Sequence, residues 1–580
     1  MQFKISIRNS SLAIPMALVM MNAWGLSPTE LSQLHSVTQE NITYATGATL
    51  LDPALKAYFQ LDPSYPDPRI AAIAPCVAGT LDIYSANTGA GFALTCKAGP
   101  VFGPLVAGKN IIVMKEANSG TALGMWYTVK NLPGSGYPAM IRTAVLEPDP
   151  TYLNSCAPPV AIPAQPPFMA YNTYSCSLQD HTAFPNVSFS EQDPSVWAGI
   201  NPITRYHANA FRSYGRVASV LQVPLGIIVN IPLRNRLQLL QGKIAGSELL
   251  DDVPSLTFTQ IAAILSGQML DWGDVWVTDA SGNTMAQVGN GTTSGMHICR
   301  YGDANGIELA AETYFFGNHC SKGNGVGSVA WWNGGSLQGK GGTWTGDVNA
   351  FTFGGATPLD VKQCVATTTI ASNDTVAYRI GFVTGDANPA SNPPLGFRYI
   401  AIDGQLPTIW SVQQHRYDWL IEPTIQYTTA SAPGPGGVGT ASLSKFFALN
   451  DPGNRKIIWD TIIGHMGNAV SLTALNRRSQ NTVGVVDSQF TGAADSGFLT
   501  LGLNWFDAWR LDTPPILYST PPYDGPSTPI WPSVIRNWLP LSIPIYPFTA
   551  GDGATSTVSK TYPGQPVNGC NPPYQKDPAG

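Results

Sequence analysis

The chain has 580 residues, of which 12% are charged and 44% are hydrophobic, and it contains 58 glycines and 48 prolines. Disorder requires low hydrophobicity together with high net charge, so this composition predicts a folded protein with many loops. The formal net charge is −6, and we therefore expect no nucleic acid partner. The length is sufficient for two or more hydrophobic cores.

Residues 1–25 are predicted to be a signal peptide. Lys4 and Arg8 give a positive start, an apolar run follows at 12–21, and Ala23 and Gly25 place small residues at the cleavage site. The run is too short to span a bilayer of about 30 Å, and no later apolar stretch is long enough. We expect a secreted protein, periplasmic or extracellular, with no membrane span after leader removal. An N-terminal membrane anchor is the alternative.

Cysteine usage agrees with export, because disulfides form outside the reducing cytosol. Six of the eight cysteines form three neighbouring pairs, each closing a loop of about 20 residues. Proximity therefore predicts the disulfides Cys76–Cys96, Cys156–Cys176, Cys299–Cys320 and, from the two that remain, Cys364–Cys570. There is no C-x-x-C and the seven histidines are scattered. We expect neither a metal site nor a cofactor.

Predicted strands and helices alternate along the chain. Apolar runs predict strands at 43–45, 81–84, 109–115, 223–230, 296–300, 377–383, 397–402 and 419–427. Helical spacing predicts helices at 52–59, 256–266, 308–316 and within 443–474. Asp52 with Pro53 is typical of a helix start, and Gly267 of a helix end. Residues 131–168 and 321–356 are interpreted as surface insertions.

This alternation predicts an α/β protein with mostly parallel sheets and loop-rich insertions, arranged as two lobes. Residues 26–222 would form the first lobe and 223–395 the second. Residues 396–580 would return to the first lobe and end in a Pro-rich tail. Ligands of such sheets bind at the carboxyl ends of strands, where helix N-termini favour an oxyanion.

Several short motifs occur in one order between about residue 43 and residue 427. They are Thr46-Gly47-Ala48-Thr49, Glu116 to Gly120, Phe189-Ser190-Glu191, residues 256–275, Arg300 with Asn305-Gly306-Ile307, Arg379 to Phe382, and Tyr417 to Leu420. In this order the chain resembles the periplasmic phosphate-binding proteins, which have the type II periplasmic-binding-protein fold. Its length suggests a divergent exported branch of that family.

The resemblance implies a binding protein that captures phosphate or a similar oxyanion for the membrane subunits of an ABC importer, and not an enzyme. The residues it implies as ligand-binding are Thr49, Leu50, Ser119, Gly120, Ser190, Glu191, Arg300, Asn305 and Gly306, with Asp303 a weaker candidate. Two positions depart from the family pattern. Asn305-Gly306-Ile307 stands where the family has Ser-Gly-Thr, and Glu191 stands where the family has the aspartate that accepts a proton from phosphate.

Each candidate also has a structural interpretation. Arg300 could form a salt bridge, Thr49 could be an ordinary helix-start residue, Ser119 and Gly120 could form a turn, and Asn305 with Gly306 could cap a helix. Ser190 and Glu191 could belong to a solvated loop. The alternative function is therefore an extracellular or surface protein that keeps the fold without the ligand. A hydrolase is a third, weaker option, because no nucleophile motif or metal cluster is evident.

Overall fold

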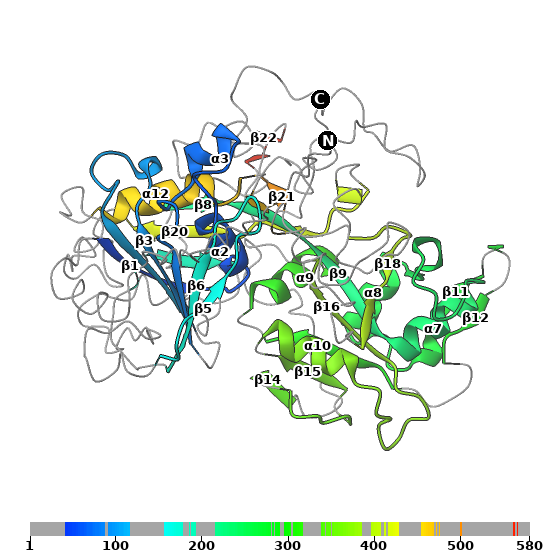
Figure 1. The fold of residues 1–580 in the computed structure, drawn as a ribbon. Coiled ribbons are helices and arrows are strands. Elements are labelled where there is room, and N and C mark those ends of the chain that lie inside the picture. The colour runs from blue at the N-terminus through cyan, green and yellow to red at the C-terminus, as the bar shows by residue number, and fades with distance from the viewer. Residues whose placement is uncertain are drawn as a thin grey trace, which may run out of the picture.

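The computed structural model describes the greater part of the chain in separate stretches. The described residues are 41–86, 91–116, 156–177, 185, 187–192, 215–279, 281–282, 285–289, 295–302, 305–316, 338–342, 344–349, 351–355, 357–385, 396–407, 411–412, 416–428, 454–468, 471–472, 475, 499–500, 561–562 and 565–566. They form two large sheets with helices packed against them (Figure 1).

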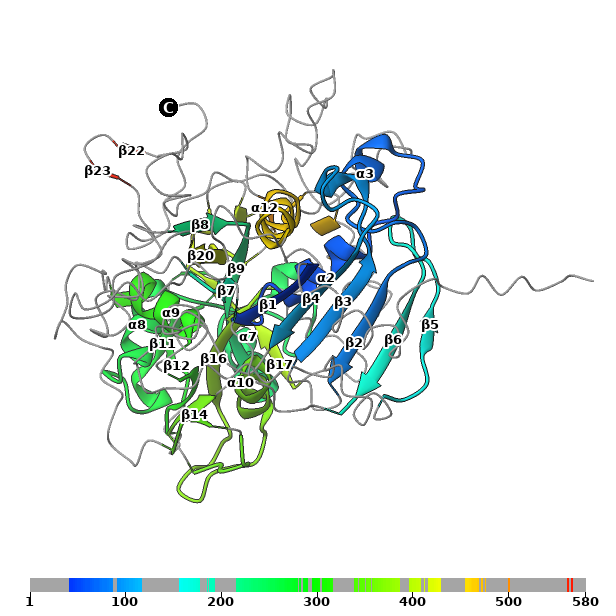
Figure 2. The same ribbon diagram turned by 90° about the vertical axis from the view of Figure 1, so that its left-hand side faces the viewer.

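The first sheet has nine strands in the order β5-β6-β2-β3-β4-β1-β7-β20-β8. Their bounds are β5 Val160–Ile162, β6 Tyr171–Cys176, β2 Asp82–Ala86, β3 Gly91–Lys97, β4 Asn110–Glu116, β1 Ile42–Gly47, β7 Val187–Ser190, β20 Thr424–Thr428 and β8 Gly215–Ser219. At its centre β4, β1 and β7 run parallel, while β3 and β20 on either side are antiparallel. Figure 2 shows these strands fanned side by side.

Three α-helices accompany the first sheet: α2 (Asp52–Phe59), α3 (Pro68–Ile73) and α12 (Arg455–His465), with the short 3-10 helix η2 (Pro100–Phe102). The indole N–H of Trp459 on α12 donates to the Thr43 hydroxyl of β1, and its ring meets Phe189 of β7 edge-on. Helix α12 lies more than 400 residues after β1 in the chain. It therefore packs against β1 and β7 of this sheet although it is distant from both in sequence.

The second sheet follows the order β14-β15-β13-β16-β9-β17, and β19 and β21 also pair with β9. Its strands are β14 Gln338–Gly342, β15 Thr352–Gly355, β13 His297–Tyr301, β16 Arg379–Thr384, β9 Leu221–Asn230, β17 Phe397–Tyr399, β19 Leu420–Ile421 and β21 Leu499–Thr500. The strands β14, β15, β13 and β16 run parallel, and β9 is antiparallel to β16.

The helices of the second sheet are α7 (Ile231–Leu240), α8 (Phe258–Leu265), α9 (Gly306–Phe316) and α10 (Pro358–Ala366). Short elements complete the described residues. They are the 3-10 helices η4 (Leu250–Asp252) and η5 (Trp272–Asp274) and the strand pairs β10 (Ser255–Leu256) with β18 (Ala401–Ile402), β11 (Trp276–Thr278) with β12 (Met285–Gln287), and β22 (Thr561–Tyr562) with β23 (Gln565–Pro566).

Local chemistry explains where α8 begins and ends. Thr257 accepts from the Gln260 amide while the Gln260 side chain accepts from the Thr257 amide, which is a capping box. At the other end Gly267 takes a φ of 70°, a left-handed conformation that favours glycine. The end predicted at Gly267 is confirmed. The start of α2 differs slightly from the prediction, because its N-cap is Leu51 and Asp52 is the first helical residue.

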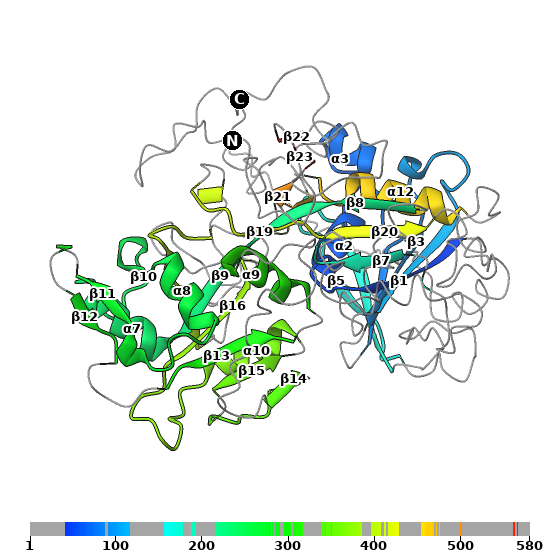
Figure 3. The same ribbon diagram turned by 180° about the vertical axis from the view of Figure 1, so that it is seen from behind.

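The chain passes between the two sheets along a two-stranded ribbon (Figure 3). One strand of the ribbon runs from β8 into β9, and the other from β19 into β20, with Leu420 opposite Pro224 and Thr424 opposite Ser219. Between these pairs the fully buried side chains of Gln222 and Glu422 are hydrogen-bonded to each other. Residues 424–428 thus return to the first sheet. The proposed domain boundaries stay a prediction.

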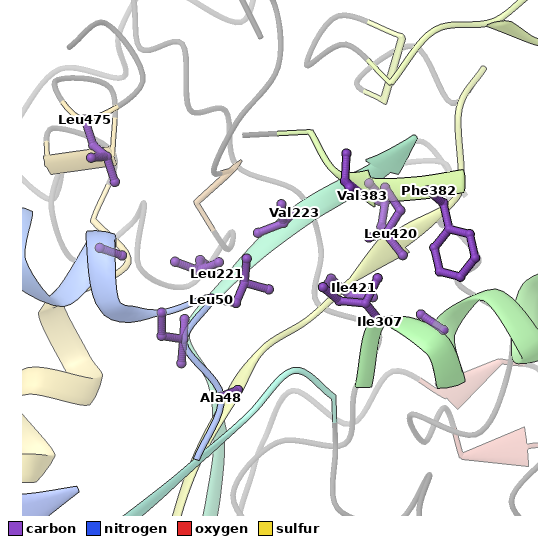
Figure 4. Packing of buried hydrophobic residues seen from close by; sticks show 14 of the residues in the cluster. Ala48, Leu50, Leu221, Val223, Ile307, Phe382, Val383, Leu420, Ile421 and Leu475 are labelled. Atoms are coloured by element: carbon purple, nitrogen blue, oxygen red, sulfur yellow. The ribbon is translucent and has the colours of Figure 1, made fainter. Parts of the chain in front are cut away.

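One continuous hydrophobic core spans both sheets and the ribbon. Figure 4 shows the apolar side chains that meet there, among them Ala48, Leu50, Leu221, Val223, Ile307, Phe382, Val383, Leu420, Ile421 and Leu475. Leu50, which begins the turn into α2, is 7% exposed, and Ile307 in the first turn of α9 is 1% exposed. The starts of both helices therefore contribute an apolar side chain to this core.

Two of the four predicted disulfides are confirmed, Cys76–Cys96 and Cys156–Cys176. The predicted pair Cys299–Cys320 is wrong, because Cys299 bonds Cys364 across 65 residues. Cys299 lies on β13 and Cys364 on α10, which packs over that strand, so tertiary contact brought together two cysteines that proximity in sequence did not. Consequently Cys364–Cys570 is wrong as well. Cys320 and Cys570 lie outside the described residues.

The predicted α/β class is confirmed, with parallel strands at the centre of the first sheet and from the β14 edge to β16 in the second, and antiparallel strands beside them. One insertion was misassigned, because residues 352–355 within the supposed surface insertion form the buried strand β15. In the described part of the chain, no helix is long and apolar enough to cross a bilayer. The predicted signal peptide, residues 1–25, and most of the Pro-rich tail fall outside the described residues.

Candidate functional site

The carboxyl ends of β4, β1 and β7 meet at one edge of the first sheet. The register pairs Ala45 with Lys115 and Gly47 with Phe189, so Glu116, Gly47 and Ser190 end adjacent strands. Carboxyl ends of parallel strands are the usual place for a ligand in α/β proteins. This edge is the candidate site.

Gly47 allows β1 to leave the sheet tightly against β7. Its φ is 105°, and a Cβ placed there would lie 2.2 Å from the Phe189 carbonyl oxygen. The next amide, of Ala48, donates to that same oxygen at 2.9 Å. No other residue type fits this close approach, so glycine fixes the direction in which the chain leaves for α2.

The turn into α2 presents backbone donors. No acceptor among the described residues takes the N–H of Thr49, Leu50 or Leu51, and the Thr49 hydroxyl also has no partner there. The Leu50 side chain is buried in the core, so only its backbone can serve a ligand. The first N–H groups of a helix have no acceptor within the helix, so these three mark a place where an outside acceptor fits.

A buried cation that sequence analysis missed lies beside this turn. Lys115 of β4 donates to the Gly47 carbonyl at 2.9 Å and the Glu116 carbonyl at 2.6 Å, and its Nζ is 3.4 Å from Asp52 Oδ1. Burial raises the pKa of Asp52, although Lys115 and Lys56 act in the opposite direction. Burial also lowers the pKa of Lys56. A lysine directly after the apolar run 111–114 was the available signal.

Glu116 is a second residue that the prediction left without a specific role. Its Oε2 accepts from the Thr46 hydroxyl at 2.9 Å, and both residues are buried. Glu116 was named only as the start of the segment leading to Ser119 and Gly120. Those two predicted ligand residues, and Asp303, lie outside the described residues.

Ser190 and Glu191 follow β7 and are buried, so the solvated-loop interpretation does not describe them. The Ser190 hydroxyl donates to the Gln192 carbonyl and accepts from the Gln192 amide at 3.2 Å. Glu191 Oε2 accepts from the Gly306 amide at 2.7 Å, and Gln192 Nε2 donates to the Gly306 carbonyl at 2.8 Å. The structure thereby brings Ser190, Glu191 and Gly306 together.

Arg300 ends up among acidic side chains of its own sheet. Its Nη2 lies 2.8 Å from Glu308 Oε1 and 3.9 Å from Glu312 Oε1, and all three residues are buried. Glu308 Oε2 also accepts from the Tyr301 amide at 3.1 Å. The salt-bridge interpretation therefore describes the contacts of Arg300.

Asn305 caps α9 in the manner of its structural interpretation. Its Oδ1 accepts from the Ile307 amide at 2.8 Å, and its carbonyl accepts from the Leu309 amide at 3.2 Å. With the Gly306 amide held by Glu191, the first two amides of α9 both have side-chain acceptors. The start of α9 is thus occupied, whereas the turn before α2 is not.

The chemistry of this site is that of hydrogen bonding. It combines the open amides of Thr49 to Leu51 with hydroxyl groups, the buried Lys115 and the carboxylates Glu116 and Glu191. Within the described residues, no group of three or more His, Cys, Asp or Glu side chains could hold a metal ion. The neighbouring second sheet contributes the α9 start through Gly306.

No family model and no curated protein matches the sequence. Among solved structures, the chain is similar to a putative phosphate ABC transporter substrate-binding protein with bound phosphate from Clostridium perfringens, at 10% identity and a TM-score of 0.33, over 76% of this chain and 98% of that one. It is also similar to PstS from Borrelia burgdorferi, at 9% identity and a TM-score of 0.30, over 76% and 97%.

A third similar structure is an ABC-type phosphate transport receptor from Vibrio cholerae, at 12% identity and a TM-score of 0.24, over 48% of this chain and 79% of that one. These neighbours are of the kind that the sequence motifs predicted. Sequence identity and TM-score are low in every case, so the function proposed below depends on the residues of this chain alone.

Proposed function

We propose that this chain is an exported solute-binding protein that captures a small oxyanion, with phosphate the first candidate, for an ABC importer. The observation that carries the proposal is the group of three open backbone amides at Thr49, Leu50 and Leu51, beside the buried Lys115. The three disulfides Cys76–Cys96, Cys156–Cys176 and Cys299–Cys364 are compatible with export, since such bonds persist in oxidising compartments.

Local groups have to hold the anion, because the formal net charge of −6 repels it. Amides at a helix start carry partial positive charge and point at whatever lies before the helix. Lys115 adds a full charge nearby, drawn close by the Gly47 carbonyl. Binding of this kind makes and breaks no covalent bond, so we propose a binding protein and no catalytic residue.

The carboxylates favour an anion that still carries a proton. When Glu116 and Glu191 are ionised, they can accept hydrogen bonds but cannot donate them. A fully ionised oxyanion also has only acceptors, so no hydrogen bond could form between it and these carboxylates. Phosphate and arsenate keep a proton near neutral pH, and sulfate does not. We therefore expect phosphate and arsenate to bind and sulfate to be rejected.

Calorimetric titration of the mature protein with phosphate, arsenate, sulfate and molybdate tests the proposal. We expect heat from phosphate and arsenate. Thr49→Ala removes one hydroxyl donor and should weaken phosphate binding about tenfold, the effect of losing one hydrogen bond to a charged group. Thr278→Ala, which removes a hydroxyl on β11 of the separate β11–β12 strand pair, is the matched control and should bind as the native protein does. Absence of heat for all four anions, with the native fold verified by circular dichroism, would contradict the proposal.

A second candidate function is an extracellular or surface protein without a ligand. The ion pair of Arg300 with Glu308 favours it, because the expected anion clamp is already neutralised. Under this alternative, millimolar phosphate leaves the midpoint of thermal unfolding unchanged. Under the leading proposal, phosphate raises that midpoint, since a ligand that binds only the folded state stabilises it.

A further inference from the structure

Two side chains that follow β7 hold both backbone groups of one residue in the second sheet's helix α9. Glu191 Oε2 accepts from the Gly306 N–H at 2.7 Å, and Gln192 Nε2 donates to the Gly306 carbonyl at 2.8 Å. Glu191 is 4% exposed and Gln192 is 8% exposed, so water competes little for these bonds. We name this contact of Glu191, Gln192 and Gly306 the Gly306 clamp.

The clamp is anchored firmly on the first sheet. The Gln192 carbonyl accepts from the Ser190 hydroxyl and, at 3.2 Å, from the Thr424 hydroxyl of β20. The same hydroxyl lies 2.9 Å from Gln426 Oε1 on its own strand, which is its alternative acceptor. The loop that carries Glu191 and Gln192 is thereby tied to two neighbouring strands, β7 and β20, and cannot follow α9 if the second sheet moves.

The clamp is anchored equally on the second sheet. Asn305 caps α9 through the Ile307 amide at 2.8 Å, which fixes the first turn. One turn later, Glu308 binds both Arg300 at 2.8 Å and the Tyr301 amide at 3.1 Å. Further along, the Tyr314 hydroxyl donates to Asp418 at 2.6 Å, just before the ribbon. Helix α9 therefore moves as one body with β13.

The clamp and the ribbon are separate connections between the two sheets. The ribbon is continuous chain, so it can bend but cannot part. The clamp is made of two hydrogen bonds to a carboxylate and an amide, so it can open and close. Two elements joined at one fixed and one separable point can rotate about the fixed one, as in hinge closure.

The charge of Glu191 suits its position. The start of α9 carries the positive end of the helix dipole, which stabilises an anion there. In this structure the anion is the protein's own carboxylate. A negative solute that approaches α9 would have to compete with Glu191 for the Gly306 amide.

We propose that the Gly306 clamp is a latch that keeps the two sheets together in the absence of solute, with Glu191 as an internal anion at the start of α9. Opening the site to a solute then requires the latch to release. This inference concerns the arrangement of the sheets and does not depend on which solute binds.

Hydrogen exchange followed by mass spectrometry, in buffer free of phosphate and other oxyanions, measures the latch directly. We compare the full mature chain with Glu191→Ala/Gln192→Ala and with Gln268→Ala, an exposed glutamine after α8 as control. The double variant should exchange the amides at the start of α9 at least about tenfold faster, since a bond to a charged group is lost. The radius of gyration from small-angle scattering should increase as well. The control should show neither change.

Glu191→Gln keeps an acceptor oxygen and removes the charge, so it carries the test if the double variant does not fold. It should give an intermediate rise in exchange at Gly306 and Ile307. Native exchange and native radius in Glu191→Gln, or in a folded double variant, would overturn the latch. Anion titration is a separate measurement. Its failure would contradict the proposed function and leave the exchange result standing.

Discussion

The two sheets hold their buried cations in different ways. In the first sheet, Lys115 donates to the carbonyls of Gly47 and Glu116, and its contact with Asp52 is longer, at 3.4 Å. In the second sheet, Arg300 lies 2.8 Å from Glu308 and near Glu312 as well. One cation is held mainly by neutral oxygens, and the other is surrounded by carboxylates.

If the chain binds an anion as proposed, this difference gives the two sheets distinct roles. A cation bound to neutral carbonyls keeps its field, whereas a cation paired with carboxylates loses most of it at a distance. The open amides of Thr49 to Leu51 lie in the turn between Gly47 and Asp52, and Lys115 contacts both of those residues. Under the proposed function, the first sheet would supply the attraction for the anion, and the second would supply the contact at Gly306 that holds the sheets together.

The largest effect on stability should follow from breaking the buried ion pair between Arg300 and Glu308. Arg300→Met leaves Glu308 buried without its cation and should lower the free energy of unfolding by about 3–5 kcal/mol. Arg300→Met/Glu308→Met removes both charges and should recover most of that loss. Urea denaturation measures both. Arg69→Met, which breaks the more exposed pair with Asp67, is the control and should cost under about 1 kcal/mol. An unchanged unfolding energy in Arg300→Met would contradict the comparison.

The disulfides allow the two sheets to be compared by loop length. Cys299→Ala/Cys364→Ala opens a loop of 65 residues in the second sheet, and Cys76→Ala/Cys96→Ala opens one of 20 in the first. Loop-closure entropy predicts losses of about 4 and about 3 kcal/mol. Chemical denaturation measures both losses, and peptide mapping of the native protein checks the bonds. A peptide that links Cys299 to Cys320 would contradict the structure.

The stability that Lys115 contributes to the first sheet should depend on pH. Lys115→Met should cost roughly 1–3 kcal/mol at pH 8, because Asp52 and two carbonyls lose their donor. Burial raises the pKa of Asp52, so its protonated form is favoured in the folded state. That stabilisation is complete below the pKa of the unfolded chain and is lost as pH rises through the folded pKa.

The loss in Lys115→Met should therefore be smaller at pH 5 than at pH 8, as measured by denaturation at both values. Asp52→Asn removes the titrating group. In that background, Lys115→Met should therefore lower the free energy of unfolding by the same amount at pH 5 and at pH 8. Equal losses for Lys115→Met at pH 5 and pH 8 would show that Asp52 does not respond to the missing cation.

The smallest effect concerns the surface of the first sheet's domain. Asp67 caps α3, accepting from the Arg69 amide at 2.9 Å, and Asp67→Ala should cost about 1 kcal/mol near pH 7. Hydrogen bonds from Arg69 lower the pKa of Asp67, so its stabilisation is present above the unfolded pKa and is lost as pH falls through the folded pKa. Thermal unfolding should show the variant and the native protein converging near pH 3. Asp279→Ala, in an exposed turn, should remain close to native at both pH values.

Much of the site's framework could be predicted from local sequence. Apolar runs located β1, β4, β9, β13 and β16 to within a few residues, and the helix ends at Gly267 and Phe316 were correct. Gly47 before Ala48-Thr49 correctly indicated a tight exit from a strand into a helix. These features depend on neighbours in the chain, which is why pattern and turn chemistry predict them.

What each polar side chain contacts was decided by the tertiary structure. Sequence alone determined that Arg300 lies at the end of a buried strand and that Asn305 and Gly306 lie at the start of a helix. Whether Arg300 faces a solute or Glu308, and whether Gly306 faces a solute or Glu191, depends on how β13, α9 and β7 are placed in space. The same holds for Cys299, whose partner is 65 residues away on α10. Strand register and helix packing bring such groups together, and the spacing of residues along one segment predicts neither of them.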